Sequence, residues 1–453
     1  MNNKSKILIV PAPIQSHIIP SLYLGELLST SFIPVFAITD FGEYKSLVQN
    51  NGFETVSQSG IKCLVNFEGR YIIQKKHKKL TFIRLINCIR KNELFKLRRQ
   101  EFYNILRDTN PQAVILDIYN STDYFVLKSI APSLNILFFN PMLSVHKIEG
   151  FPEVSDGEWE ISGSSIENNL FKSGKKRGKL DLEFTKAYIL NYFLLKQRKE
   201  ILKTSGIKAD NVDFSNKYTL VFKNVPELIL APEELEFSKE VRLPWQYYLG
   251  LCLQKHRKIE GFNSDFTYRW EEILRRKKKI VYCSFGTYYS GTNKVLYEFV
   301  TKLVAVFEQM PDVELIVAVN RFIRETMVAN MLMPKNINFF SYVPQLLILE
   351  RSDLFITHGG LGSIKEAIFY KVPMLVYPIS KQYDPTGNGL KVEYHKIGLR
   401  GEFESEKLND MKNKIDQLLG EPMFKDRIGE FHHRVQCNYS KQNNVETLIS
   451  LIL

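Results

Sequence analysis

Three glycines stand in a short segment that directly follows the apolar run Leu354–Thr357, and this segment reads His358-Gly359-Gly360-Leu361-Gly362-Ser363. The apolar run predicts a buried strand, and the residues after Ser363 predict a helix. Glycines at such a turn let a phosphate approach the backbone, and the helix start offers free N–H groups and a positive dipole end. His358 could add a hydrogen bond or a charge, and Ser363 adds a hydroxyl group. Glu366 lies within reach of a ribose diol. The segment indicates a phosphate-binding turn, although glycine at a tight turn is also common for structural reasons alone.

A histidine close to the first apolar run, Ile7–Pro11, is a second candidate for chemistry. His17 lies in the segment Pro13 through Pro20. A residue on the first strand-to-helix loop of a parallel sheet points into the ligand crevice, and histidine can serve there as a general base. Asp117, at the end of the apolar run Ala113–Ile118, is the candidate to orient it and to stabilise its charged form. Taken alone, a loop histidine is more often a helix cap or a surface group.

Other nucleotide and hydrolase motifs are absent from the sequence. Gly174 and Gly178-Lys179 are one residue short of a P-loop spacing, and Leu180 stands where Ser or Thr is required. There is no GxSxG nucleophile elbow. There is also no DxD pair, so the sequence offers no evident metal–diphosphate clamp.

Short apolar runs alternate with helical stretches throughout the chain, and this alternation must position the candidate residues. Several runs are continuous, as is typical of parallel strands buried on both faces. The alternation in both halves predicts an α/β protein with two doubly wound Rossmann-like domains facing across a cleft. The remaining predicted strands are Pro34–Ile38, Cys63–Phe67, Ile136–Phe139, Leu228–Ala231, Lys279–Phe285, Val313–Val319, Ile337–Tyr342 and Pro373–Tyr377.

Length and composition agree with two domains. The chain has 453 residues, 44% of them hydrophobic and 24% charged, as in ordinary globular proteins. No run approaches the ~20 apolar residues of a membrane span, and the N-terminal run is interpreted as a strand rather than a secretory signal. The five cysteines form no CxxC pair, so a reducing, cytoplasmic setting is expected. The net charge of +12 favours anionic partners, but no nucleic-acid signature accompanies it.

The predicted domains are residues 1–240 and 241–435, with a helix at 436–453 that could cross back to the first domain. Within the first domain, the alternation breaks at residues 144–216. This stretch contains a helix with Phe184, Tyr188, Tyr192 and Leu195 on one face. That face is interpreted as packed on the core, or alternatively as an insertion lining an apolar substrate pocket.

Four features together resemble the UDP-dependent glycosyltransferases of the GT-B class, family 1, including the bacterial macrolide type. The first is the segment Pro13 through Pro20, and the second is Asp117, 100 residues after His17. The third is Ser284-Phe285-Gly286-Thr287. The fourth is the block from Tyr342-Val343-Pro344-Gln345 through Thr357–Gly360, Glu366-Ala367 and Val372-Pro373-Met374 to Asp384 and Asn388. The resemblance covers nearly the whole chain and is weakest at residues 60–110 and 144–216.

This resemblance implies a set of roles. His17 would deprotonate an acceptor hydroxyl with Asp117 behind it, and Tyr342 would stack on uracil. The backbone at Gln345 would bind the base, and Glu366 the ribose hydroxyls. Asp384 would contact the transferred sugar. The diphosphate would be held by His358, Gly360, Gly362, Ser363 and Thr287. The remaining residues of the nucleotide-sugar site would be Ser284, Gly286 and Val343.

The sequence also departs from the family pattern. Asp384-Pro385 stands where relatives have Asp-Gln, and proline has neither an amide side chain nor an N–H donor. The identity of the sugar is therefore open. Leu361 and Gly362 replace the Trp and Asn of plant relatives, and Ser16 replaces a common glycine.

The resemblance implies an inverting, metal-independent hexosyltransferase that uses a UDP-sugar as co-substrate and has no other cofactor. Its acceptor would be a small apolar molecule that carries a hydroxyl, as in natural-product glycosylation. Two alternatives stay open. One is a GT-B transferase acting on a membrane lipid, docked peripherally through basic runs and the Phe184/Tyr188/Tyr192 face. The other is a catalytically silent nucleotide-binding partner subunit.

Overall fold

The computed structural model describes residues 4–39, 43–60, 82–158, 182–216, 219–254, 264–285, 293–379 and 383–453. For residues 182–187, 241, 264 and 265 it describes the backbone alone. The predicted strand Cys63–Phe67 and the predicted site residues Gly286 and Thr287 lie outside these ranges.

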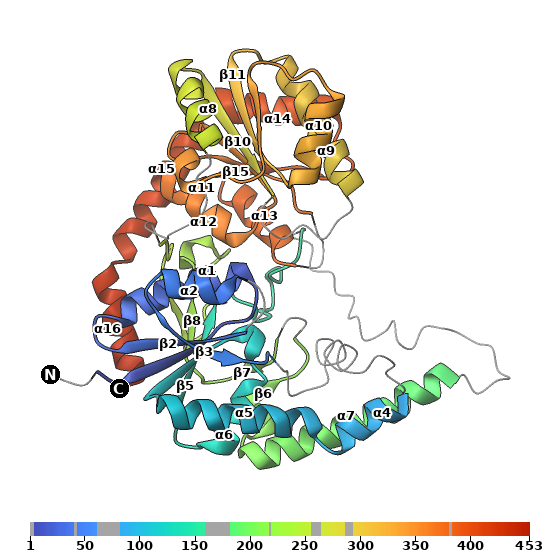
Figure 1. Ribbon diagram of the computed structural model, residues 1–453, viewed down its shortest axis with the longest axis vertical. Helices are drawn as coiled ribbons and strands as arrows, with labels where there is room; N and C mark the ends of the chain where they lie inside the picture. Colours follow the sequence, from blue (N-terminus) through green and yellow to red (C-terminus); the bar gives the residue numbers. More distant parts are fainter. Residues whose placement is uncertain are drawn as a thin grey trace.

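The first half of the chain forms a parallel sheet in the strand order β3-β2-β1-β4-β5-β8-β9 (Figure 1). Side chains alternate between its faces, as the pleat of a strand requires. In β1, Ile7 and Ile9 pack under α1 and α16, whereas Leu8 and Val10 pack under α5 and α6. The strands are β1 (Lys6–Val10), β2 (Ile33–Thr39), β3 (Glu54–Gln58), β4 (Ala113–Asp117), β5 (Asn135–Asn140), β8 (Glu227–Ile229) and β9 (Gln246–Tyr248).

Helices cover both faces of this sheet. Those of the first half are α1 (Gln15–Leu28), α2 (Tyr44–Asn50), α4 (Phe82–Arg90), α5 (Glu93–Thr109), α6 (Asp123–Ile130) and α7 (Leu182–Ser205). A small antiparallel pair, β6 (Val212–Asp213) with β7 (Val221–Phe222), follows α7. Short 3-10 turns are η1 (Ile118–Asn120), η3 (Ala209–Asn211), η4 (Glu233–Leu235) and η5 (Lys239–Val241).

The second half forms another parallel sheet, in the order β12-β11-β10-β13-β14-β15. Its strands are β10 (Lys279–Ser284), β11 (Val313–Ala318), β12 (Ile337–Phe340), β13 (Leu354–Thr357), β14 (Met374–Val376) and β15 (Gly398–Arg400). The helices are α8 (Ser264–Arg275), α9 (Asn293–Glu308), α10 (Arg321–Asn330), α11 (Gln345–Leu349), α12 (Leu361–Tyr370), α13 (Pro385–Tyr394), α14 (Leu408–Gly420), α15 (Pro422–Asn438) and α16 (Lys441–Ile452). None of the helices in the described ranges is both long and apolar enough to cross a membrane.

The prediction of two α/β domains with doubly wound parallel sheets is confirmed. The first sheet continues past residue 240, because β9 pairs with β8 and extends the sheet to Tyr248. The last helix, α16, packs on α1 of the first domain, where Lys441 pairs with Glu26 at 2.5 Å. The chain therefore ends on the domain in which it began (Figure 1).

Buried polar contacts join the two domains. The Lys365 ammonium on α12 donates to the Leu230 carbonyl after β8 at 2.5 Å, and burial lowers the pKa of this lysine. Lys391 on α13 pairs with Glu236 at 3.6 Å, and both side chains are almost fully buried. Because a buried lysine is tolerated only with a close partner, these contacts fix how the domains meet.

The helix predicted around residues 184–195 exists as α7, but its predicted packing is wrong. Tyr188, Tyr192 and Leu195 are exposed by 72%, 58% and 47%. α7 instead turns Leu190, Phe193 and Leu194 toward α4 and lies on the side of the first domain away from the second (Figure 1). Nothing is described for the side chain of Phe184.

Candidate active site

The parallel pairing of β1 with β4 brings His17 and Asp117 together. Val10 lies opposite Leu116 in this ladder, so Asp117 stands at the same sheet edge as the loop that leads into α1. His17 is the third residue of α1, and its Nδ1 lies 2.8 Å from Asp117 Oδ2. Asp117 is fully buried and His17 is 5% exposed. The contact spans 100 residues of sequence.

The Asp117 carboxylate is held on both oxygens. Oδ2 also accepts from the Ala12 backbone N–H at 3.0 Å, and Oδ1 accepts from the Tyr119 backbone N–H at 2.9 Å. The Tyr119 ring lies beside the His17 ring, with centroids 4.5 Å apart. Since a carboxylate accepts the hydrogen bond, Nδ1 of His17 carries the proton and Nε2 is left as the basic nitrogen. In this arrangement an aspartate fixes the orientation of a histidine ring.

The predicted nucleotide residues Gln345, Ser363 and Glu366 form one hydrogen-bonded group at the start of α11 and the first turns of α12. Gln345 Nε2 donates to Glu366 Oε2 at 2.5 Å and to Ser363 Oγ at 3.3 Å. Tyr282 in β10 donates its hydroxyl to Gln345 Oε1 at 3.2 Å. Tyr342 lies close by in sequence with 53% of its side chain exposed, and Val343 is buried. An exposed aromatic ring beside a fixed amide and carboxylate can bind a nucleoside.

The turn after β13 is shaped by its glycines. Gly359 has a φ of +88°, and a Cβ there would lie 2.8 Å from the Pro385 carbonyl oxygen. A Cβ on Gly360 would lie 2.6 Å from His358 Nε2, so the histidine ring fills the space at that glycine. A Cβ on Gly362 would meet no atom within 4 Å. The start of α12 is therefore open, and its backbone N–H groups can receive an anion.

His358 is neutral near pH 7 in this structure. Burial lowers its pKa to about 4, and Nδ1 has no hydrogen-bond partner among the described residues. The sequence left open whether His358 supplies a charge or a hydrogen bond. A neutral ring can supply a hydrogen bond but no charge.

Asp384 precedes α13 and faces the first domain. Asn388 Nδ2 donates to Asp384 Oδ2 at 2.9 Å and to the Gly359 carbonyl at 3.0 Å. Burial raises the pKa of Asp384, while the bond from Asn388 and the proximity of His17 lower it. The start of α13 lies against the first domain, because a Cβ on Gly387 would lie 2.1 Å from the Val154 carbonyl oxygen. Pro385 is the first residue of α13, a position at which a missing N–H costs no helical hydrogen bond.

Ser284 is buried at the end of β10, opposite Thr357 in β13. The described site residues thus gather at the carboxyl ends of both sheets. Sequence reasoning gave no role to Tyr119, Tyr282 or Asn388. Asn388 carried a signal, because it lies one helical turn after Asp384.

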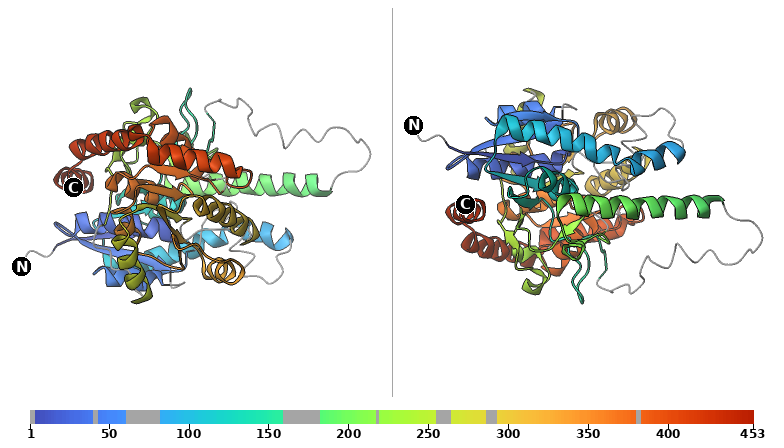
Figure 2. Two further views of the ribbon diagram at one scale, coloured as in Figure 1. Left: turned by 90° about the horizontal axis from the view of Figure 1, so that it is seen from above. Right: turned by 90° about the horizontal axis from the view of Figure 1, so that it is seen from below.

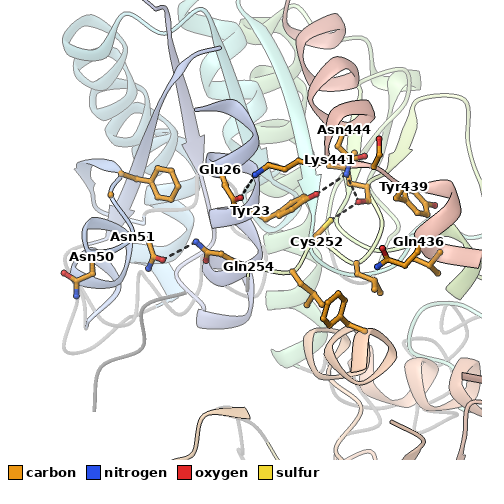
Figure 3. Close-up of a pocket in the computed structure, with 18 residues that line it drawn as sticks. Tyr23, Glu26, Asn50, Asn51, Cys252, Gln254, Gln436, Tyr439, Lys441 and Asn444 are labelled. Atoms are coloured by element: carbon orange, nitrogen blue, oxygen red, sulfur yellow. Dashed lines mark hydrogen bonds and ion pairs between the residues drawn. The ribbon is translucent and has the colours of Figure 1, made fainter. Parts of the chain in front are cut away.

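A cavity of about 780 Å³ lies elsewhere, between α1, residues 249–254 and the junction of α15 with α16 (Figure 3). Tyr23 and Glu26 line it from α1, and Tyr439 and Lys441 line it from the other side. None of the predicted site residues lines this cavity. The candidate active site therefore lies at the facing sheet edges and not in this cavity.

Comparison with known families and proteins agrees with this geometry. Residues 290–429 match the glycosyltransferase family 28 C-terminal domain. A stretch of 48 residues is 52% identical to the uncharacterized UDP-glucosyltransferase YdhE of Bacillus subtilis, covering 11% of this chain and 12% of that protein. The oleandomycin glycosyltransferase of Streptomyces antibioticus is 23% identical over 226 residues, which cover 50% of this chain and 48% of that protein. The chain thus spans less than half the length of these two relatives.

Solved structures share the fold over the whole chain. The glycosyltransferase of kitacinnamycin superposes with a TM-score of 0.66 and 17% identity, covering 100% of both chains. The spinosyn rhamnosyltransferase SpnG, in complex with thymidine diphosphate, superposes with a TM-score of 0.61 and 14% identity, covering 98% of this chain and 99% of that one. The chain has the GT-B fold, and its predicted resemblance to the family 1 UDP-dependent glycosyltransferases is confirmed.

Proposed function

We propose that the protein is an inverting glycosyltransferase that moves a sugar from a UDP-sugar to a hydroxyl group of a small, apolar acceptor. The observation that carries this proposal is the buried His17–Asp117 pair, which faces the nucleotide-type site across the two sheet edges. Transfer to a hydroxyl group needs a base, and a histidine oriented by an aspartate can act as one.

The proposed reaction is a single displacement. Nε2 of His17 takes the proton of the acceptor hydroxyl, whose oxygen attacks the anomeric carbon from the side opposite the nucleotide. The bond from the anomeric carbon to the diphosphate oxygen breaks, and UDP leaves with its electron pair. Asp117 stabilises the imidazolium that forms. The anomeric centre is inverted, so an α-linked donor gives a β-linked product.

The leaving diphosphate would gain negative charge at the start of α12. The open space beside Gly362 and the unbonded N–H groups of the first helical turn suit that charge. His358, Gly360, Ser363 and Thr287 would complete the phosphate site, without a metal ion. Tyr342, Gln345 and Glu366 would bind the nucleoside.

Asp384 would bind hydroxyl groups of the transferred sugar. Its fixed carboxylate, on the His17 side of the site, supports this role. Because Pro385 cannot add an amide contact, a sugar other than glucose is a serious candidate. The nucleotide also needs a direct test, since the neighbour SpnG is described with thymidine diphosphate.

The decisive experiment separates nucleotide binding from transfer in a His17→Ala variant. We expect transfer to a panel of small phenolic and alcoholic acceptors to fall by a factor on the order of 10² to 10⁴, because the base is lost. Binding of UDP, measured by calorimetry, should not change. His433→Ala, on the exposed surface of α15, is the matched control and should keep both properties.

Two results would count against the proposal. Equal loss of UDP binding and transfer in His17→Ala would remove the assignment of His17 as the base. If the unaltered chain binds UDP but turns over no UDP- or TDP-sugar, the silent-subunit alternative takes its place.

A further inference from the structure

The outward side of α7 carries one continuous stripe of exposed residues. Tyr188, Tyr192, Leu195, Lys199 and Lys203 follow one another at intervals of four, three, four and four residues, which places them on one face of the helix. The two tyrosines and the leucine are exposed by 72%, 58% and 47%, and both lysines are exposed. The stripe is therefore aromatic and apolar toward the N-terminal end of α7 and basic toward its C-terminal end.

The other side of α7 is firmly attached to the first domain. Leu190, Phe193 and Leu194 pack with Leu85, Ile89 and Leu94 of α4 and α5, and Ile201 is buried. The Gln197 side chain donates to Asn92 at 2.8 Å. The helix thus has its core contacts already, and the stripe is an additional surface. Such a row of exposed large side chains typically marks an interaction site.

The basic end of the stripe leads into a lysine-lined cavity. Lys203 belongs both to the stripe and to the lining of this cavity, whose volume is about 580 Å³. Lys128, Lys208 and Lys223 also line it, and no Asp or Glu is among its described lining residues. Among the described residues, neither Lys199 nor Lys203 forms an ion pair. The cavity is thus suited to a group that carries negative charge, such as a phosphate.

We propose that the stripe and the lysine cavity together bind the surface of an anionic phospholipid bilayer. Tyrosine and leucine on a convex helix insert at headgroup level, and lysines beside them meet lipid phosphates. α7 lies on the outside of the first domain (Figures 1 and 2), and the side chains of the stripe are on its exposed face. A nucleic acid would use the lysines but would leave Leu195 exposed, and a second copy of this chain would bring like charges together.

This inference does not rest on the proposed activity. α7, which carries the stripe, lies on the side of the first domain away from the second domain, whereas the candidate active site is at the facing sheet edges (Figure 1). It concerns where the protein binds, whether the acceptor is a lipid or a small molecule.

The test is co-sedimentation of the full chain with vesicles. Wild type should bind vesicles of equal parts phosphatidylcholine and phosphatidylglycerol, should bind vesicles of phosphatidylcholine alone at least tenfold more weakly, and should be released by salt. Lys199→Gln with Lys203→Gln should weaken binding about fivefold per lysine. Tyr188→Ser with Tyr192→Ser should also weaken it, with circular dichroism confirming an intact helix.

A matched control changes similar residues elsewhere. Tyr268 on α8 is 63% exposed and Lys425 on α15 is exposed, so Tyr268→Ser with Lys425→Gln should bind as wild type does. The inference fails if the wild-type protein does not bind anionic vesicles, or if the control variant loses as much binding as the stripe variants. It also fails if the stripe variants instead abolish a dimer in sedimentation velocity, or reduce binding to RNA without affecting vesicles.

Discussion

Three histidines of this chain show how surroundings decide what one residue type can do. His17 is held by the Asp117 carboxylate at 2.8 Å. His358 is deprived of solvent and has its pKa lowered to about 4. His395, which directly follows the last residue of α13, also has its pKa lowered to about 4 by burial, although its Nε2 donates to the Glu236 carbonyl at 3.2 Å. Of the three, His17 is the one that we propose as the base.

Stability should therefore fall in mild acid, in part because of His395. Its pKa is about 4 in the folded chain and ~6.5 in the unfolded chain, so between these values the unfolded chain binds more protons. Stability from this residue is complete above pH ~6.5 and is lost as the pH falls toward 4. In chemical unfolding at a series of pH values, His395→Gln should lose less stability than wild type across this window. The exposed His433→Gln should lose as much as wild type, and identical pH dependence in His395→Gln and wild type would contradict the prediction.

At the scale of elements, α13 fits between the domains because of small residues in its first turn. Pro385 starts the helix, and its carbonyl lies against Gly359 of the phosphate-type turn. Two residues later, a Cβ on Gly387 would lie 2.1 Å from the Val154 carbonyl oxygen of the first domain. The first turn of α13 is therefore in backbone contact with the turn after β13 and with the first domain.

Gly387→Ala should separate the first domain from α13. We expect a loss of about 1–3 kcal/mol in the free energy of unfolding, because the backbone of Val154 and Ser155 resists the new methyl group. Gly429→Ala on α15 is the matched helical control: nothing lies within 4 Å of its Cβ, so it should gain about 0.5–1 kcal/mol from helix propensity. Denaturant titration of both variants measures the difference, and similar values for the two would refute the close contact.

At the scale of the whole molecule, one buried ion pair holds the two domains together. Glu236 accepts from the Ser144 backbone N–H at 2.8 Å and the Tyr248 hydroxyl at 2.9 Å, and it pairs with Lys391 from the other domain. Lys391 also lies 4.5 Å above the Phe237 ring. The Glu236 carboxylate is therefore compensated from both domains.

Lys391→Met should leave that carboxylate buried without its counter-charge. A loss of about 3–5 kcal/mol is expected, and the added change Glu236→Gln should restore part of it. The exposed pair Lys412–Asp416 on α14 is the control, since Lys412→Met should cost less than about 0.5 kcal/mol. Equal melting temperatures for Lys391→Met and Lys412→Met would show that the buried pair does not hold the domains.

Most strands can be predicted from the local sequence, and the strands that were not predicted are either polar or very short. Strands such as Leu354–Thr357 were predicted because continuous apolar runs report burial on both faces. The edge strand β3, with the sequence Glu-Thr-Val-Ser-Gln, was missed because it is partly exposed and mostly polar. β9 and β15 were missed because each has only three residues.

The sequence by itself determined the alternation of strands and helices, the glycine turn after β13 and the types of residue at the two sheet edges, because these depend on neighbours in the chain. Only the tertiary structure decided that His17 meets Asp117 at 2.8 Å, since a contact across 100 residues depends on β1 and β4 being neighbours in the sheet. It also decided that Tyr188 and Tyr192 face outward, because helical periodicity gives a face but not what covers it. Burial in the assembled site likewise made His358 neutral, which no local pattern could reveal.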